Sequence, residues 1–184
     1  MGWLRSASRN RLSCAAYCPP ASPAGYHKRI APVLQISVHH DLNAPAELIW
    51  ELLADFANIE RWWPTDDPAV QIDRVELEGE GIGLIRHIYN LGFADPVSER
   101  LDAQDPANMS YQLSIVGQRP AGITAYQAHG RIEPLGADRC RLHYRGEFTT
   151  QPGRGQEAEA FLRGAYALMF RGLEQSAERM RSPV

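Results

Sequence analysis

From about residue 70 to residue 149, apolar side chains recur at every second position through six successive segments. A period of two is typical of a strand with one buried face, because successive side chains of a strand point to opposite faces. Parallel strands need crossovers of a dozen residues or more, so the short turn-like breaks between these segments predict antiparallel hairpins. The predicted strands cover residues 70–77, 82–89, 95–103, 109–116, 123–132 and 140–149.

The segment before these strands predicts one more strand and two short helices. Residues 33–40 alternate in polarity and form the predicted first strand. From Ala46 onward apolar side chains recur at helical spacing, with Asn43 as the predicted N-cap and Pro45 tolerated in the first turn. A second, shorter helical piece is predicted over residues 57–63.

The chain closes with one long amphipathic helix, predicted over residues 157–179. Its predicted apolar stripe consists of Ala158, Phe161, Ala165, Leu168, Met169 and Leu173. The complete order predicts an α+β domain, in which a seven-stranded antiparallel sheet wraps around the long C-terminal helix and two short helices follow the first strand.

The N-terminal residues differ in composition from the predicted domain. Residues 1–40 contain five basic residues and no acidic one, and the stretch is rich in Ser, Ala and Pro. For residues 1–32 we expect a disordered extension or a start codon assigned too far upstream, although an Arg-rich, acid-free segment also resembles an organellar transit peptide. The ligand-binding domain is predicted over residues 33–180, with a short tail over 181–184.

Charge, hydropathy and cysteine content exclude several classes of protein. A net charge of −3 gives no general attraction to nucleic acid. No stretch approaches the roughly 20 apolar residues of a membrane-spanning helix, and three cysteines cannot form a disulfide scaffold. We expect a soluble, cytoplasmic protein with no nucleic-acid partner and no membrane span, and a homodimer is compatible with the sequence.

Three groups of motifs carry a resemblance to a known family. They are residues 43–50 (NAPAELIW), residues 55–59 (DFANI) followed by 62–64 (WWP), and residues 98–101 (SERL). In this order and spacing the chain resembles the helix-grip fold of the START and birch-pollen-allergen (SRPBCC) superfamily. It is most similar to the polyketide cyclase/dehydrase and lipid-transport branch, over about residues 33–180.

A more distant likeness links the chain to the plant abscisic-acid receptors. Residues 99–102 (ERLD) and 114–117 (SIVG) resemble two runs of that family. The family's Ser-Gly-Leu-Pro-Ala gate is replaced by residues 90–94 (NLGFA), and its His-Arg-Leu latch by residues 118–120 (QRP). The ligand-binding lysine also lacks a counterpart, because the chain's single lysine is Lys28. The likeness therefore implies shared architecture without hormone-receptor function.

The fold implied by the resemblance encloses a cavity between the sheet and the long helix, and such sites are mostly apolar with a few orienting polar groups. Strand parity and helix position then predict the residues that bind a ligand there. They are Trp63, Ile88, Phe93, Glu99, Leu101, Tyr111, Leu113, Tyr126, Tyr144, Phe161, Ala165 and Met169.

Glu99 is the most informative of these residues, because an ionised carboxylate on an inner face needs a partner or a raised pKa. It is either a ligand-orienting or acid/base group or the structural partner of an arginine such as Arg86. Parity places Arg86 and His87 on opposite faces, so one of the two faces the cavity. Tyr126 and Tyr144 either donate hydrogen bonds to a ligand or pack in the core.

Three functions are compatible with such a cavity. The leading hypothesis is a binding or carrier protein for a small hydrophobic or amphipathic molecule, such as a lipid, an isoprenoid or an aromatic polyketide. The alternative is a polyketide cyclase, aromatase or dehydratase in which Glu99, Arg86 or a tyrosine moves protons. The third is a regulatory module whose loop at Phe93 changes on binding and recruits a protein.

None of the three functions requires a cofactor, and the sequence predicts no metal site. His39 and His40 are neighbours in a predicted strand, so they point to opposite faces and cannot easily share one ion. Cys140 is predicted to be a small buried hydrophobic residue rather than a nucleophile.

Overall fold

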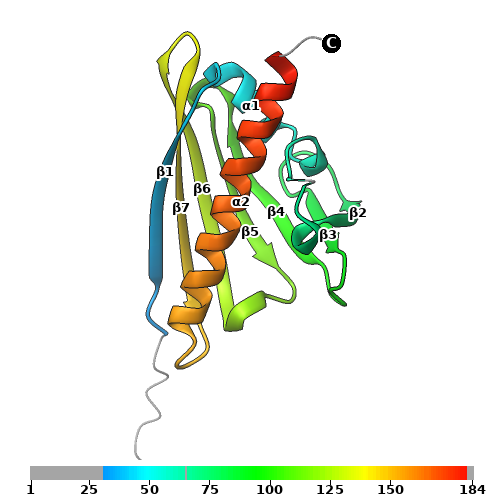
Figure 1. Ribbon diagram of the computed structural model, residues 1–184. Helices are drawn as coiled ribbons and strands as arrows, with labels where there is room; N and C mark the ends of the chain where they lie inside the picture. The colour runs from blue at the N-terminus through cyan, green and yellow to red at the C-terminus, as the bar shows by residue number, and fades with distance from the viewer. Residues whose placement is uncertain (1–30, 65, 182–184) are drawn as a thin grey trace, which may run out of the picture. The chain divides into compact units, whose positions relative to one another are not determined.

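The computed structural model describes residues 31–64 and 66–181, which form one antiparallel sheet covered by a long helix (Figure 1). Residues 1–30, which make up most of the extension predicted over 1–32, and residues 182–184 lie outside the described residues. The strands are β1 (Leu34–Leu42), β2 (Ile72–Glu78), β3 (Ile85–Asn90), β4 (Val97–Asp105), β5 (Ser110–Val116), β6 (Ile123–Gly136) and β7 (Arg139–Thr150). The helices are α1 (Ala46–Ala54) and α2 (Gly155–Arg181), with single 3₁₀ turns at η1 (Ile59–Arg61), η2 (Pro68–Val70), η3 (Pro106–Asn108) and η4 (Pro120–Gly122).

The sheet has the strand order β1-β7-β6-β5-β4-β3-β2, and every neighbouring pair is antiparallel. Strands β2 to β7 follow one another as hairpins, and β1 closes the order by pairing with β7. The predicted α+β helix-grip fold is therefore confirmed. The two longest strands, β6 and β7, form the hairpin that projects at the top of Figure 1.

The predicted strands at 70–77 and 82–89 begin too early. Residues 68–70 form the 3₁₀ turn η2 instead, so β2 starts at Ile72. Ile82 is exposed in the β2–β3 turn, where Gly79, Gly81 and Gly83 all have positive φ. The left-handed conformation interrupts the ladder, and β3 starts only at Ile85.

Helix α1 lacks the predicted N-cap. Pro45 stands at the capping position, no side chain caps the helix, and Asn43 is exposed. The fixed φ of proline, here −54°, is compatible with helix entry, and the Pro45 carbonyl accepts the first helical hydrogen bond from Ile49. The predicted second helix over 57–63 is reduced to the single turn η1.

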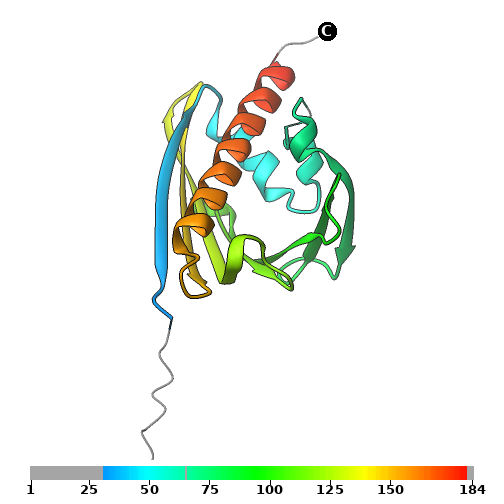
Figure 2. The same cartoon turned by 60° about the horizontal axis from the view of Figure 1, so that its bottom comes forward.

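Helix α2 crosses the concave face of the sheet, as Figures 1 and 2 show from two directions. Its predicted stripe is only partly buried. Ala158, Met169 and Leu173 are buried as expected, whereas Phe161 is 42 % exposed. The remaining buried apolar side chains are Leu162, Tyr166, Phe170 and Ala177.

Close packing holds α2 against the segment that follows η1. A Cβ atom on Gly172 would lie 2.1 Å from the main-chain oxygen of Trp62, so only glycine permits this approach. The Ser176 hydroxyl donates to the Arg61 carbonyl at 2.8 Å, and the Arg171 guanidinium lies 3.2 Å from Asp67. These contacts fix the two tryptophans of the segment relative to the helix.

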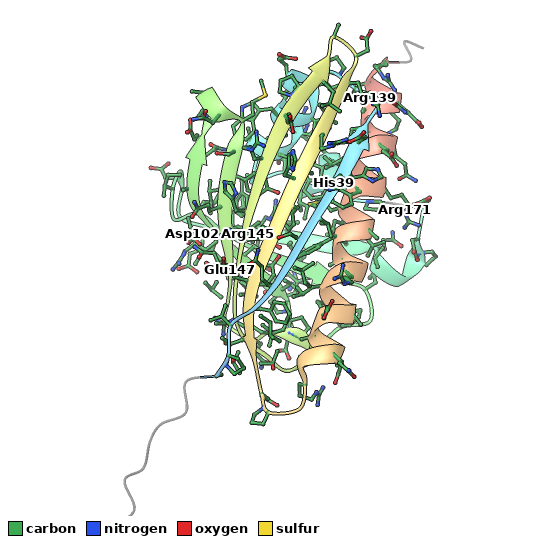
Figure 3. The ribbon with its side chains drawn as sticks, turned by 90° about the vertical axis from the view of Figure 1, so that its left-hand side faces the viewer. His39, Asp102, Arg139, Arg145, Glu147 and Arg171 are labelled. Carbon is green, nitrogen blue, oxygen red and sulfur yellow. The ribbon has the colours of Figure 1, made fainter. Side chains whose placement is uncertain are left out.

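The outer, convex face of the sheet is polar. Figure 3 places Asp102, Arg145 and Glu147 on the face directed away from α2. Arg145 pairs with Glu147 at 2.8 Å, and Asp102 accepts a hydrogen bond from Ser114. The sheet therefore buries one face, and that face is the one that can hold a ligand.

Candidate functional site

A cavity of about 620 Å³ lies between the concave face of the sheet and α2. Its wall is built by strands β3 to β7, by α2, by the segment around η1, and by the β3–β4 and β5–β6 loops. Cavities of roughly 300–1,000 Å³ accept molecules of drug size. The size and position are those of a small-molecule binding site.

The structure brings nearly all predicted site residues to this wall. They are Trp63, Arg86, Ile88, Phe93, Glu99, Tyr111, Leu113, Tyr126, Tyr144, Phe161, Ala165 and Met169. Leu101 differs, because it is buried in the core outside the cavity lining, in the middle of β4. Contact of the lining residues with a ligand remains a prediction.

The stripe residues of α2 that are not fully buried have a simple explanation. Phe161, Ala165 and Leu168 all line the cavity, whereas Phe170 and Ala177 are buried away from it. Helix α2 thus has two apolar flanks, one against protein and one against the cavity space. Helical periodicity alone does not distinguish these flanks.

Arg86 and Glu99 form an ion pair on the cavity wall. The two residues lie directly opposite each other in the β3–β4 ladder. The Arg86 guanidinium donates to Glu99 Oε2 from Nη2 at 2.6 Å and from Nε at 2.8 Å. Their side chains are 5 % and 18 % exposed, so each charge is balanced by the other in a poorly solvated place.

The same guanidinium also ties the sheet to the segment after α1. Its Nη1 donates to the Phe56 carbonyl at 2.8 Å, and its carbon lies 4.1 Å above the centre of the Phe56 ring. Of the two candidates on β3, Arg86 is therefore the one that faces the cavity. His87 lies on the other face and contacts Ser98 at 2.8 Å.

Four tyrosines that line the cavity form a cluster: Tyr111, Tyr126 and Tyr144 on the sheet and Tyr166 on α2. The hydroxyls of Tyr126 and Tyr166 are hydrogen bonded at 3.0 Å, and the rings of Tyr144 and Tyr166 meet edge to face at 4.8 Å. Burial raises the pKa of each phenol above its usual value, and the Glu99 charge adds to this effect for the three on strands. The cluster therefore presents neutral hydroxyl groups at physiological pH.

Two glycines make room for the tyrosine cluster. A Cβ on Gly130 would lie 2.5 Å from the Tyr111 ring, and a Cβ on Gly146 would lie 2.0 Å from the Tyr166 hydroxyl oxygen. Ladder positions that carry no side chain thus leave room for these aromatic groups against the concave face. The depth and polarity of this wall depend on glycine as much as on tyrosine.

The two tryptophans at residues 62 and 63 both line the cavity. Trp62 is buried in the core, and its Nε1 makes no hydrogen bond within the described part of the chain. Trp63 is half-buried, and its Nε1 donates to the Val70 carbonyl at 2.7 Å. Trp63 was predicted as a site residue, and the structure adds its neighbour Trp62 to the cavity lining.

One end of the cavity is open to solvent. We call this end the mouth and define it by exposed or half-buried lining residues on three segments: residues 93–95, residues 118–120 and Phe161. The β3–β4 loop, the β5–β6 loop and the first turns of α2, which carry these residues, lie at the same end of the sheet in Figures 1 and 2. Phe93, at 67 % exposure, is the most solvent-accessible large apolar residue there.

The described residues contain no group of three His, Cys, Asp or Glu side chains that could hold a metal ion. His39 and His40 diverge, since His40 stacks on Phe170 while His39 approaches His143. Burial raises the pKa of the Cys140 thiol to about 11, so the thiol is protonated at neutral pH.

No helix in the described ranges is long and apolar enough to cross a membrane.

The family model described as "Polyketide cyclase / dehydrase and lipid transport" matches residues 34–178. The match runs from the first residue of β1 into the last turns of α2. The chain belongs to this family. The resemblance predicted from the motifs at 43–50, 55–64 and 98–101 is thereby confirmed, whereas a comparison with curated proteins finds no match.

Solved structures similar to this member of the polyketide cyclase/dehydrase and lipid-transport family share its fold. Norcoclaurine synthase from Thalictrum flavum has a TM-score of 0.69 at 18% identity, covering 83% of this chain and 99% of its own. The Zhui aromatase/cyclase from Streptomyces sp. R1128 has a TM-score of 0.65 at 21% identity, and the match covers 80% of this chain and 95% of the Zhui chain. XoxI from Bacillus cereus has a TM-score of 0.67 at 20% identity, and the match covers 81% of this chain and 99% of the XoxI chain.

Several lining residues of the family member's cavity were not predicted from the sequence, and Tyr166 and Arg119 are the ones that bear on its chemistry. Tyr166 was placed outside the apolar stripe, although its position i+4 from Leu162 and i−4 from Phe170 gives the signal for the buried flank. Arg119 belongs to the loop at the mouth and lines the cavity there. Loop side chains follow no periodicity, so no sequence signal identifies Arg119.

Proposed function

We propose that the protein binds and carries a small hydrophobic or amphipathic molecule, of the class of lipids, isoprenoids or aromatic polyketides, in this cavity. The observation that supports the proposal best is the inner wall, where apolar side chains surround one group of neutral phenols and an ion pair whose charges balance each other. Apolar burial supplies affinity at about 25 cal/mol per Å² before ordering costs. The phenols fix the orientation of a ligand oxygen.

A neutral apolar probe and a cavity-filling substitution test this proposal. N-phenyl-1-naphthylamine should bind one to one and fluoresce. Ala165→Phe places a ring in the cavity and should weaken binding by about tenfold or more, which corresponds to about 1.4 kcal/mol. Native mass spectrometry of the same protein should show an apolar molecule that denaturing extraction releases.

Ala167→Phe is the matched control. Ala167 is exposed on α2 two residues away and does not line the cavity. It should leave probe binding unchanged. Equal binding by the two variants would mean that the probe occupies another place and would refute a cavity binder.

The arrangement of charged and phenolic groups also supports a second candidate, an enzyme of the polyketide cyclase type. The Zhui structure is that of an aromatase/cyclase, and its fold is shared. Here Glu99 Oε1 makes no hydrogen bond to the described residues, and it belongs to the same wall as the phenols. A proton acceptor and proton donors thus line one space.

Glu99→Gln separates the two candidates. For a carrier, affinity for an inert ligand should fall by at most about 1–2 kcal/mol, because one charged hydrogen bond is weakened. For a cyclase that uses Glu99 as general base, turnover of a poly-β-keto thioester should fall by about a hundredfold or more. Glu147→Gln, which changes an ion-paired glutamate on the outer face, is the control and should change neither quantity.

A further inference from the structure

The cavity lining contains four charged side chains within the described residues: Arg86, Asp95, Glu99 and Arg119. Arg86 and Glu99 neutralise each other at 2.6 Å in the interior. Arg119 and Asp95 lie at the mouth, and neither forms an ion pair with any described residue. The interior is therefore electrically balanced, whereas the mouth carries separate charges.

The Arg119 guanidinium is held in place by the main chain. Nε donates to the Ile115 carbonyl and Nη1 to the Gly117 carbonyl, both at 3.0 Å. Two such bonds fix the plane of the group, while Nη2 donates to none of the described residues. A guanidinium that is already ordered loses little conformational entropy when it binds an anion.

Burying an anion deeper in the cavity is unfavourable. An ionised carboxylate loses its hydration there, and the one interior cation is already bound to Glu99. The tyrosine cluster offers neutral hydroxyls, which suit a ligand hydroxyl or carbonyl. An acidic group on a ligand is therefore stabilised at the mouth and not at the inner wall.

We propose that Arg119 forms an anion subsite at the mouth, and that the ligand is an amphipathic acid whose apolar body enters the cavity while its carboxylate stays at Arg119. This inference rests on the proposed cavity-binding function and adds the charge and the orientation of the ligand. Asp95 is exposed on the β3–β4 loop, so its negative charge, screened by water, weakly repels a carboxylate bound at Arg119.

A series of ω-(2-naphthyl)alkanoic acids and their methyl esters tests the inference, because each acid differs from its ester in charge at the same apolar body. By calorimetry, the acid of best-fitting length should bind wild-type protein about fivefold more tightly than its ester, as expected for a partly exposed charge pair. Arg119→Gln should reduce this ratio to about one, and rising salt should do the same in wild type. Asp95→Asn should increase acid affinity by about twofold and leave the ester unchanged.

Arg163→Gln is the control for loss of positive charge. Arg163 lies on α2, pairs with Glu159 at 2.8 Å and does not line the cavity. The anion subsite would be overturned if wild type bound acid and ester equally, or if Arg119→Gln and Arg163→Gln lost the same amount of acid affinity. In either case, binding of the ester would still support the proposed function. Failure of every acid and ester to bind would contradict both.

Discussion

At the scale of single residues, the cavity wall depends on positions without a side chain. Gly146 faces the Tyr166 hydroxyl so closely that a Cβ there would lie 2.0 Å from its oxygen. That hydroxyl is not free to move, because it is hydrogen bonded to Tyr126 and its ring packs on Tyr144. A side chain at position 146 would therefore displace Tyr166 and, through it, the other tyrosines that it contacts.

Gly146→Ala should destabilise the protein by about 1–3 kcal/mol in urea unfolding, as is typical of overpacked cores. Adding Tyr166→Phe removes the clashing oxygen and should recover part of the loss. Gly164→Ala is the control, since a Cβ there meets nothing within 4 Å, and alanine in a helix should stabilise by about 0.5–1 kcal/mol. A Gly146→Ala variant as stable as wild type would show that the cluster relaxes freely.

At the scale of elements, the period of the apolar pattern was enough to predict the sheet, and the residues at inner positions of β3 to β7 followed from parity. The ends of the strands were less predictable. The apolar pattern places the start of β3 at Ile82, but the positive φ angles of Gly79, Gly81 and Gly83 keep this stretch in a turn. Pro45 likewise replaced Asn43 at the start of α1. In both places backbone conformation outweighs side-chain polarity.

The cavity explains most of the remaining differences between sequence and structure. A pattern of apolar residues predicts burial, but it does not distinguish packing against protein from lining an internal space. Phe161 belongs to the predicted apolar stripe of α2 yet is exposed at the mouth, whereas Leu101 was predicted to line the cavity and lies in the core. Contacts from loops, such as that of Arg119, depend on tertiary geometry that no local pattern encodes.

At the scale of the whole molecule, burial of the four clustered tyrosines couples their protonation to folding. Their pKa values are raised by burial, so the folded state binds these protons more tightly than the unfolded state, where a phenol ionises near pH 10. Their contribution to stability is complete below about pH 10 and is lost as the pH rises toward the folded pKa values. Stability should therefore fall steeply in alkali, with several protons released together.

Alkaline titration followed by tyrosinate absorbance and far-ultraviolet circular dichroism should test this coupling. Of the seven tyrosines of the chain, the four in the cluster should ionise only as the sheet unfolds, in one transition seen by both signals. Tyr126→Phe should reduce the amplitude of that transition by one cluster phenol and leave the earlier ionisation unchanged. If all tyrosines ionised near pH 10 while the circular dichroism stayed native, the cluster would be open to solvent, and the phenols would not be the neutral, water-excluded donors that orient a ligand.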